Sequence, residues 1–202
     1  MYKRQPLGFT ATPSDRIAPP PDLAAAPAER SVAAPAERGD DVVAPVARPA
    51  GAREPLPRRV LVADAGLDAR VEPVGVTDRG DMTVPGDPSV AGWYRHGSTP
   101  GDDRGSAVLV GHVDTDTGEV GEFAALYDVR RGQRVEVRRA GAEPVRYRVV
   151  SRVTVPKDEL PPSVFRRTGT PVLTLITCAP PFLPERGGYR SNLVVTAEPV
   201  GR

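Results

Sequence analysis

The sequence predicts an all-β fold, a single barrel or sandwich, preceded by a disordered arm that is rich in alanine and proline. From about Arg58, short runs of valine and leucine alternate with glycine, proline and aspartate, which is typical of strands joined by turns. Before that point lie 11 of the 24 prolines and only two aromatic residues. Helical periodicity is scarce throughout. The chain therefore divides into an arm, residues 1–57, and one domain, residues 58–202.

The arm has a composition that does not support a packed core. The sequence Ala-Ala-Pro-Ala-Glu-Arg occurs at 25–30 and again at 33–38. Too little apolar surface is present to offset an ordering cost of about 1–2 kcal/mol per residue, so we expect either an extended spacer or a low-complexity terminus. No stretch approaches the roughly 18 apolar residues of a membrane span, and no signal-peptide core follows Met1. We therefore expect neither an anchor nor an export signal within these residues.

The first half of the domain is expected to contain three strands and a short helical turn. Residues 60–63, 69–74 and 107–110 are apolar or alternating runs bounded by glycine, proline or aspartate. Residues 121–127 have room for one or two turns of helix between such runs.

The second half is expected to supply the remaining strands. In residues 133–138, arginine and glutamate alternate with valine, as in a strand with one face in water. A hairpin is expected at 139–143, because Gly141 can adopt a positive φ. The further expected elements are a helical turn within 157–165 and strands at 145–150, 172–177 and 193–197. Seven or eight short strands in about 145 residues suffice for one barrel or sandwich core.

Charge and composition exclude several classes of function. The formal net charge is +1 and the charged residues are interleaved, so no electrostatic footprint for nucleic acid is present. Asp114 and Asp116 are two residues apart but lack the rest of a calcium-binding loop. We therefore expect no metal and no other cofactor.

Cys178 is the only cysteine, so the chain cannot form an intramolecular disulfide. It follows the apolar run 172–177 and precedes Pro180 and Pro181, which we expect to turn the chain away immediately after the thiol. A nucleophile can occupy such a position at the end of a strand. The alternative role, and the commoner one for a single cysteine, is that of a small buried apolar residue.

Two histidines and two arginines are the candidate partners of this thiol. His112 follows the strand 107–110, whereas His96 lies beside turn residues and is expected to be a surface or packing residue. A cysteine needs a neighbouring cation to be a thiolate near neutral pH. Arg190 precedes the last strand and would stand beside Cys178 if the last two strands pair; Arg186, in the preceding glycine-containing loop, is the alternative.

The segment Thr174–Cys178, Thr-Leu-Ile-Thr-Cys, resembles the Thr-Leu-x-Thr-Cys motif of the sortases, the cysteine transpeptidases of Gram-positive bacteria. Gly111–Asp114 is similar to the histidine segment of that family, and Tyr189–Val195 is similar to its arginine segment. The resemblance covers about residues 58–199. In detail it is greatest to the class F sortases of actinobacteria, and a composition rich in alanine, proline and arginine suits a high-GC organism.

The resemblance implies a closed eight-stranded β-barrel and a ping-pong reaction. A cysteine thiolate attacks the threonine carbonyl of a Leu-Pro-x-Thr-Gly-type sorting signal, and an amine, such as that of lipid II or a peptidoglycan stem peptide, resolves the thioacyl enzyme. The resemblance assigns Cys178 as nucleophile, His112 as general acid and base, and Arg190 as partner of the substrate carbonyl and of the oxyanion. Thr177 and Arg186 are expected to contact substrate. The implied location is the outer side of the membrane or the cell wall, with a membrane anchor upstream of this chain.

One departure and two alternatives accompany this resemblance. Class F sortases often have glycines after the cysteine, whereas residues 179–181 are Ala-Pro-Pro here, which is expected to stiffen and narrow the substrate groove. The alternatives are a sortase-like pseudoenzyme that binds cell wall, and a cysteine peptidase that uses no amine acceptor.

Overall fold

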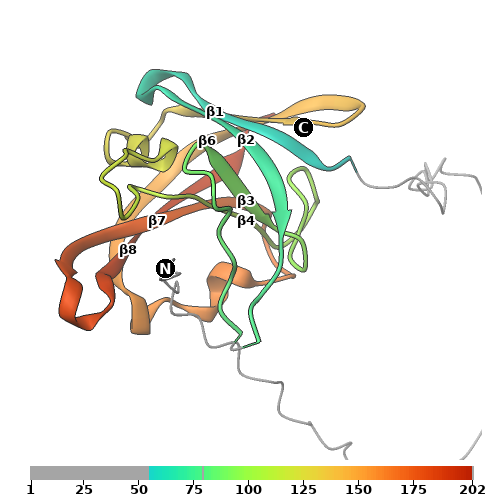
Figure 1. The fold of residues 1–202 in the computed structure, drawn as a ribbon. Helices are drawn as coiled ribbons and strands as arrows, with labels where there is room; N and C mark the ends of the chain where they lie inside the picture. The colour runs from blue at the N-terminus through green and yellow to red at the C-terminus, as the bar shows by residue number, and fades with distance from the viewer. Residues whose placement is uncertain (1–54, 79, 202) are drawn as a thin grey trace, which may run out of the picture. The chain divides into compact units, whose positions relative to one another are not determined.

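The computed structural model describes residues 55–78 and 80–201, and within them eight strands form a closed barrel (Figure 1). The strands are β1 (Pro57–Val62), β2 (Leu67–Val74), β3 (Val90–Tyr94), β4 (Ser106–Val110), β5 (Arg134–Arg139), β6 (Ala142–Pro156), β7 (Val172–Leu183) and β8 (Gly188–Pro199). Around the barrel they follow the order β1-β2-β3-β4-β7-β8-β6-β5. The all-β prediction is confirmed, and the fold is the barrel rather than the sandwich. The expected arm lies outside the described residues, apart from residues 55–57.

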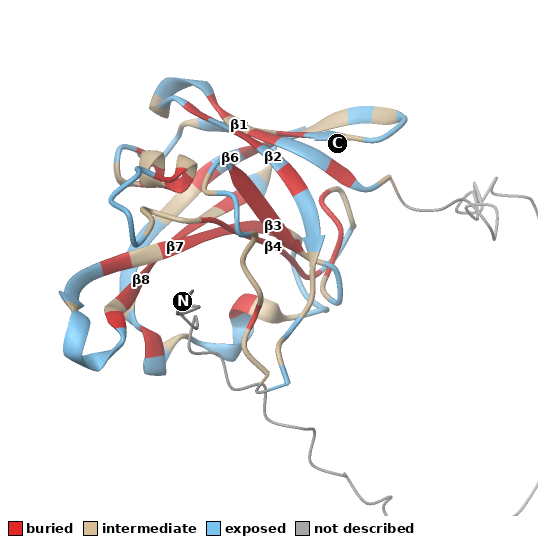
Figure 2. Ribbon diagram, viewed as in Figure 1, coloured by how far each residue is buried: buried red, intermediate tan, exposed pale blue. Residues whose placement is uncertain are grey.

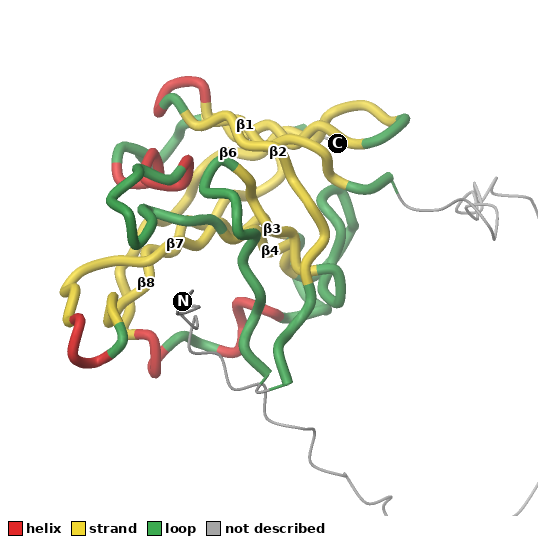
Figure 3. The backbone as a smooth tube through the Cα atoms, viewed as in Figure 1, coloured by secondary structure: helices red, strands yellow, loops and turns green. Residues whose placement is uncertain are grey.

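Helical structure in the described residues is limited to short 3-10 segments between strands (Figure 3). These segments are η1 (Ala63–Ala65), η2 (Glu122–Tyr127), η3 (Lys157–Glu159), η4 (Pro162–Phe165) and η5 (Pro184–Arg186). The two helical turns expected from the sequence correspond to η2 and to the pair η3 and η4. No helix in the described part of the chain has the length and hydropathy of a membrane span.

The strand β3 has no counterpart among the expected strands, for a physical reason. Its residues are buried from Val90 to Trp93, so the run lacks the alternation that marks a strand with one wet face. Gly92 further obscures the strand in the sequence. Glycine is needed there because a methyl group would come within 2.9 Å of side-chain atoms of Val74 and Pro85. Close packing at this point needs a residue that is a weak strand former.

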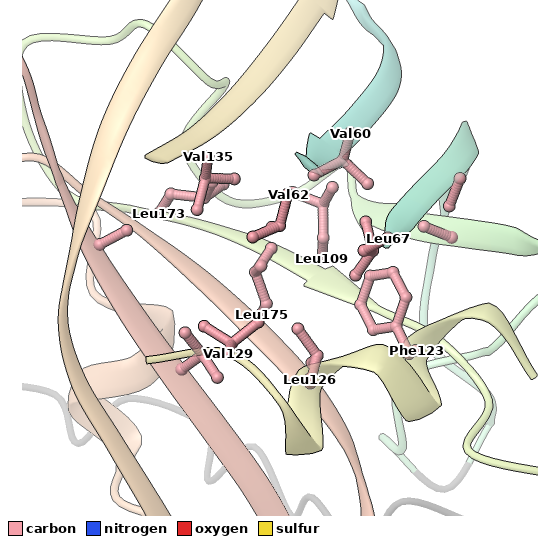
Figure 4. Close-up of a cluster of buried hydrophobic side chains, with 14 of the residues drawn as sticks. Val60, Val62, Leu67, Leu109, Phe123, Leu126, Val129, Val135, Leu173 and Leu175 are labelled. Atoms are coloured by element: carbon pink, nitrogen blue, oxygen red, sulfur yellow. The ribbon is translucent and has the colours of Figure 1, made fainter. Parts of the chain in front are cut away.

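Two clusters of apolar side chains lie on opposite faces of the barrel wall. The larger fills the interior, where Phe123 and Leu126 of η2 are fully buried against strand residues such as Leu109 and Leu175 (Figure 4). The smaller includes Val110, Ile176 and Val194 on the outer face, where Val164 of η4 and residues of the β2–β3 connection cover them. Cys178 packs at the edge of this outer cluster.

The chain does not turn away after Cys178, so that expectation is wrong. Strand β7 continues to Leu183 and stays paired with β8, with Ala179 opposite Ser191 and Phe182 opposite Tyr189. Pro180 and Pro181 therefore lie in a β-bulge, which accommodates residues that cannot donate to the strand ladder. Beyond the bulge the β7–β8 hairpin is mostly exposed (Figure 2). The thiol is thus in the middle of a long strand.

Candidate active site

The parallel pairing of β4 with β7 places His112 beside Cys178. Val110 pairs with Ile176, so His112 and Cys178 each lie two residues further along adjacent chains. The backbone N–H of Gly111 donates to the carbonyl of Ile176 over 3.2 Å, which continues the ladder beyond the end of β4. Adjacent strands are about 4.8 Å apart, so the imidazole and the thiol belong to one site.

The His112 ring is oriented by the β2–β3 connection. Its Nε2 lies 2.8 Å from the carbonyl oxygen of Pro85. A carbonyl only accepts hydrogen bonds, so Nε2 bears a proton in this contact, and Nδ1 is the nitrogen that exchanges a proton when the ring is neutral. The backbone is fixed as well, because Phe123 N donates to the His112 carbonyl over 3.1 Å. The contact with Pro85 therefore leaves Nδ1 as the ring nitrogen that is available to exchange a proton.

The Cys178 thiol is half-buried and lies among polar groups. Burial is the largest influence on the thiol and raises its pKa; the charge of Lys157 and a hydrogen bond from it oppose this effect, and Asp114 adds to it. The Tyr127 hydroxyl donates to the Cys178 carbonyl over 3.0 Å and holds the strand at this point. The site thus contains a lysine that lowers the pKa of Cys178 and an aspartate that raises it.

Strand β8 places Arg190 next to this pair. Asn192 is directly opposite Cys178 in the antiparallel register, and Arg190 lies two residues along β8, on the same face and opposite the bulge. The Arg190 side chain is half-buried. Arg186, in contrast, is exposed in η5 at the tip of the hairpin, several residues beyond Cys178. The fold therefore brings Cys178, His112 and Arg190 together and leaves Arg186 at the periphery.

Thr177 lies on the inner face of the barrel wall. It is fully buried, and its hydroxyl donates to the carbonyl of Gly111 over 2.9 Å. This bond links the residue before Cys178 to the residue before His112. The Thr177 hydroxyl therefore fixes the spacing between Cys178 and His112. Only the backbone of Thr177 remains for the expected contact with substrate.

Several residues of the site were not expected from the sequence as functional residues. Tyr189 on β8 donates through its hydroxyl to Asp114 Oδ2 over 2.5 Å, which ties β8 to the loop after His112. Burial raises the pKa of Tyr189, and the bond to Asp114 adds to the shift. Phe182 contacts the Tyr189 ring edge-on, with centroids 4.9 Å apart. Asp114 and Tyr189 lie within the segments that resemble sortases, but the sequence does not show that they contact each other across 75 residues.

Other features of the described residues lie away from the thiol. His96 is exposed and contacts the Tyr94 ring edge-on, in accord with a surface role. No group of three or more histidine, cysteine, aspartate and glutamate side chains in the part of the chain that the structure describes could hold a metal ion. A cavity of about 240 Å³ lies at the other end of β8. It is lined by Gly101, Arg139, Pro144, Val145, Arg146, Pro199, Val200 and Gly201.

Comparison with known proteins agrees with the fold. The sortase domain model matches residues 62–200. Similar solved structures include sortase C2 of pilus island 1 from group B Streptococcus, with 24% identity and a TM-score of 0.54 over 71% of this chain and 73% of that one. Sortase C-1 of Actinomyces oris has 23% identity and a TM-score of 0.55 over 71% of each chain. Sortase C of Streptococcus pneumoniae has 17% identity and a TM-score of 0.56 over 74% of this chain and 71% of that one.

A search of curated protein sequences gives no match. The domain match nevertheless extends over more than half of the chain, from the end of β1 to just beyond β8. The chain therefore belongs to the sortase family.

Proposed function

We propose that this sortase cleaves a Leu-Pro-x-Thr-Gly-type sorting signal through a thioacyl intermediate on Cys178 and transfers the acyl group to a cell-wall amine. The observation that supports this most is the meeting of three groups from three chain segments: Cys178 in β7, His112 just after β4 and Arg190 in β8. A nucleophile, a proton carrier and a fixed cation are what acyl transfer from a peptide requires.

The first half of the reaction forms the thioacyl enzyme. Cys178 passes its proton to Nδ1 of His112, and the thiolate attacks the threonine carbonyl carbon. The electron pair of the C=O bond moves to the oxygen, and the Arg190 guanidinium donates hydrogen bonds to that oxyanion. When the tetrahedral intermediate collapses, the C–N bond breaks and His112 returns its proton to the leaving amine of glycine. The Nε2 bond to Pro85 persists throughout, which keeps the ring in place.

The second half is the reverse sequence with another amine. His112 takes a proton from the acceptor nitrogen as that nitrogen attacks the thioester carbonyl carbon and a new C–N bond forms. The C–S bond then breaks, and His112 returns this proton to the Cys178 sulfur. Lipid II or a peptidoglycan stem peptide is the class of acceptor we propose.

We infer a location on the outer side of the membrane, with residues 1–57 as spacer and an anchor upstream. We also assign the chain to class F of the actinobacteria, on the sequence similarities given above.

Mass spectrometry of the protein with sorting-signal peptides and diverse amines tests this proposal. We expect an adduct on Cys178 equal in mass to the peptide up to its threonine acyl group, and a ligated product when the amine is added. Adduct formation with hydrolysis alone, whichever amine is supplied, would identify a cysteine peptidase without an acceptor. Absence of any adduct would identify a pseudoenzyme or a wall-binding module.

The choice between the two arginines is tested by a pair of conservative substitutions. Arg190→Lys is expected to lower kcat/KM by about tenfold or more, because the ammonium of lysine cannot reproduce a two-pronged contact with an oxyanion. Arg186→Lys, a matched change at the exposed hairpin tip, is expected to leave kcat/KM within about twofold. The reverse ranking of the two variants would assign the oxyanion partner to Arg186.

A further inference from the structure

We propose that Lys157 is a second cationic residue of the active site, which serves as counterion of the Cys178 thiolate while Asn192 lies between them as a further hydrogen-bond donor. The inference depends on the proposed function only in that Cys178 is the nucleophile. It adds a residue to the group formed by cysteine, histidine and arginine.

The register of three neighbouring strands gives the placement. Lys157 begins η3 directly after β6, where Pro156 pairs with Ser191 and Val155 pairs with Asn192 of β8. Asn192 in turn pairs with Cys178 of β7. Lys157 and Cys178 are thus on either side of β8, with Val155 level with Cys178 and Lys157 two residues further along, level with Arg190. The lysine side chain spans this gap, because it makes a hydrogen bond with the Cys178 side chain.

Burial and composition indicate that this lysine has a specific role. Lys157 is only 9% exposed, and lysine is among the residues least often buried without a partner. The chain contains only two lysines, Lys3 and Lys157, against 25 arginines. The chain thus uses arginine at almost every other basic position. A compact ammonium with three donors suits a single sulfur atom better than a planar guanidinium does.

Asn192 supplies an independent observation. Its side chain is fully buried, and both Nδ2 and Oδ1 lack a hydrogen-bond partner among the described residues. An unsatisfied buried amide destabilises the folded state, so natural proteins keep one chiefly where a partner arrives during function. Directly opposite Cys178, that partner is the thiolate or the carbonyl oxygen of the thioacyl group, either of which accepts from Nδ2.

Lys157 is one of several charged and titratable groups that surround the Cys178 thiol. The others come from the loop after β4, from η2 and from β8, and they are His112, Asp114, Tyr127, Tyr189 and Arg190. Burial of the thiol and the carboxylate of Asp114 both favour the neutral form and raise the pKa of Cys178. The charge on Lys157 acts in the opposite direction, so its removal is expected to raise the pKa of Cys178.

The test is the rate of alkylation of Cys178 by iodoacetamide as a function of pH, in the full chain with its single thiol. Lys157→Met keeps the aliphatic stem and removes the charge. It is expected to move the alkylation profile to higher pH by about one unit or more, and so to slow alkylation at pH 7 by about tenfold. Lys157→Arg, which restores a cation, is expected to return the rate to within about threefold of that of the unsubstituted protein.

Arg148→Met is the matched control, because it removes one positive charge from an exposed position on β6; its profile should coincide with that of the unsubstituted protein. Circular dichroism establishes folding, and Lys157→Gln repeats the measurement if the methionine variant does not fold. A folded variant without the charge that retains the original pH profile would overturn the proposal. Alkylation needs no peptide substrate, so this result is separate from success or failure of the transpeptidation assay.

Discussion

Cys178→Ala is expected to abolish the thioacyl adduct and to reduce transpeptidation by on the order of 10⁴-fold or more, as removal of a catalytic nucleophile does in other acyl-transfer enzymes. The reason is that the described residues contain no second thiol to take over the attack. The measurement is the mass of the enzyme after incubation with a sorting-signal peptide, together with the yield of amine-ligated product. Unchanged cleavage of every such peptide by the alanine variant would exclude Cys178 as the nucleophile.

Cys178→Ser provides the control for folding and shape. A hydroxyl replaces the thiol at almost the same volume, so the strand and its bond to Tyr127 are preserved. We expect this variant to be as inactive as the alanine variant. A serine hydroxyl is far less acidic than a thiol, so His112 is not expected to remove its proton in this site. Loss of activity with both variants, and with unchanged circular dichroism, would separate chemistry from folding.

The strands were predictable where one face of the sheet is wet or where an apolar run has clear ends. Residues 133–138 alternate and form β5 as Arg134–Arg139, and Gly141 has the positive φ expected at the hairpin. Buried β3 does not alternate and was missed. The lengths of β7 and β8 were also underestimated, because two prolines normally end a strand, whereas a bulge opposite Arg190 lets the pairing resume at Phe182.

The placement of the three candidate catalytic residues was predictable from the sequence, whereas their contacts with neighbouring residues were not. Cys178, His112 and Arg190 lie in short local motifs, so their similarity to sortases is visible in the sequence. Asp114, Tyr189 and Asn192 lie in the same similar segments, but their positions around the thiol depend on strand pairing and loop contacts that no local pattern encodes. Lys157 was covered only by the helical turn expected within residues 157–165, and its proximity to Cys178 follows from the register of β6, β8 and β7.

The second large effect is expected from Gly121→Ala, which acts on His112 through the backbone. Gly121 precedes η2 with φ −80° and ψ 154°, values that any residue adopts, so backbone strain plays no part. A methyl group there would lie 2.2 Å from the carbonyl oxygen of His112 and 2.6 Å from its carbonyl carbon. The overlap is with backbone, so one or both of the segments that contain Gly121 and His112 must shift, and we expect His112 to be displaced. A displacement of about 1 Å at a catalytic group can reduce the rate by about a hundredfold.

We expect Gly121→Ala to lower kcat for transpeptidation and to leave the reactivity of the Cys178 thiol unchanged. Alkylation of Cys178 at high pH, where the thiolate forms without help from His112, should stay near that of the unsubstituted protein, whereas kcat for transpeptidation should fall about a hundredfold. Gly86→Ala is the matched control, because a methyl group there meets no atom within 4 Å and the residue follows Pro85, the other partner of His112. Equal kcat in the two alanine variants would contradict the expected dependence of acyl transfer on the placement of His112.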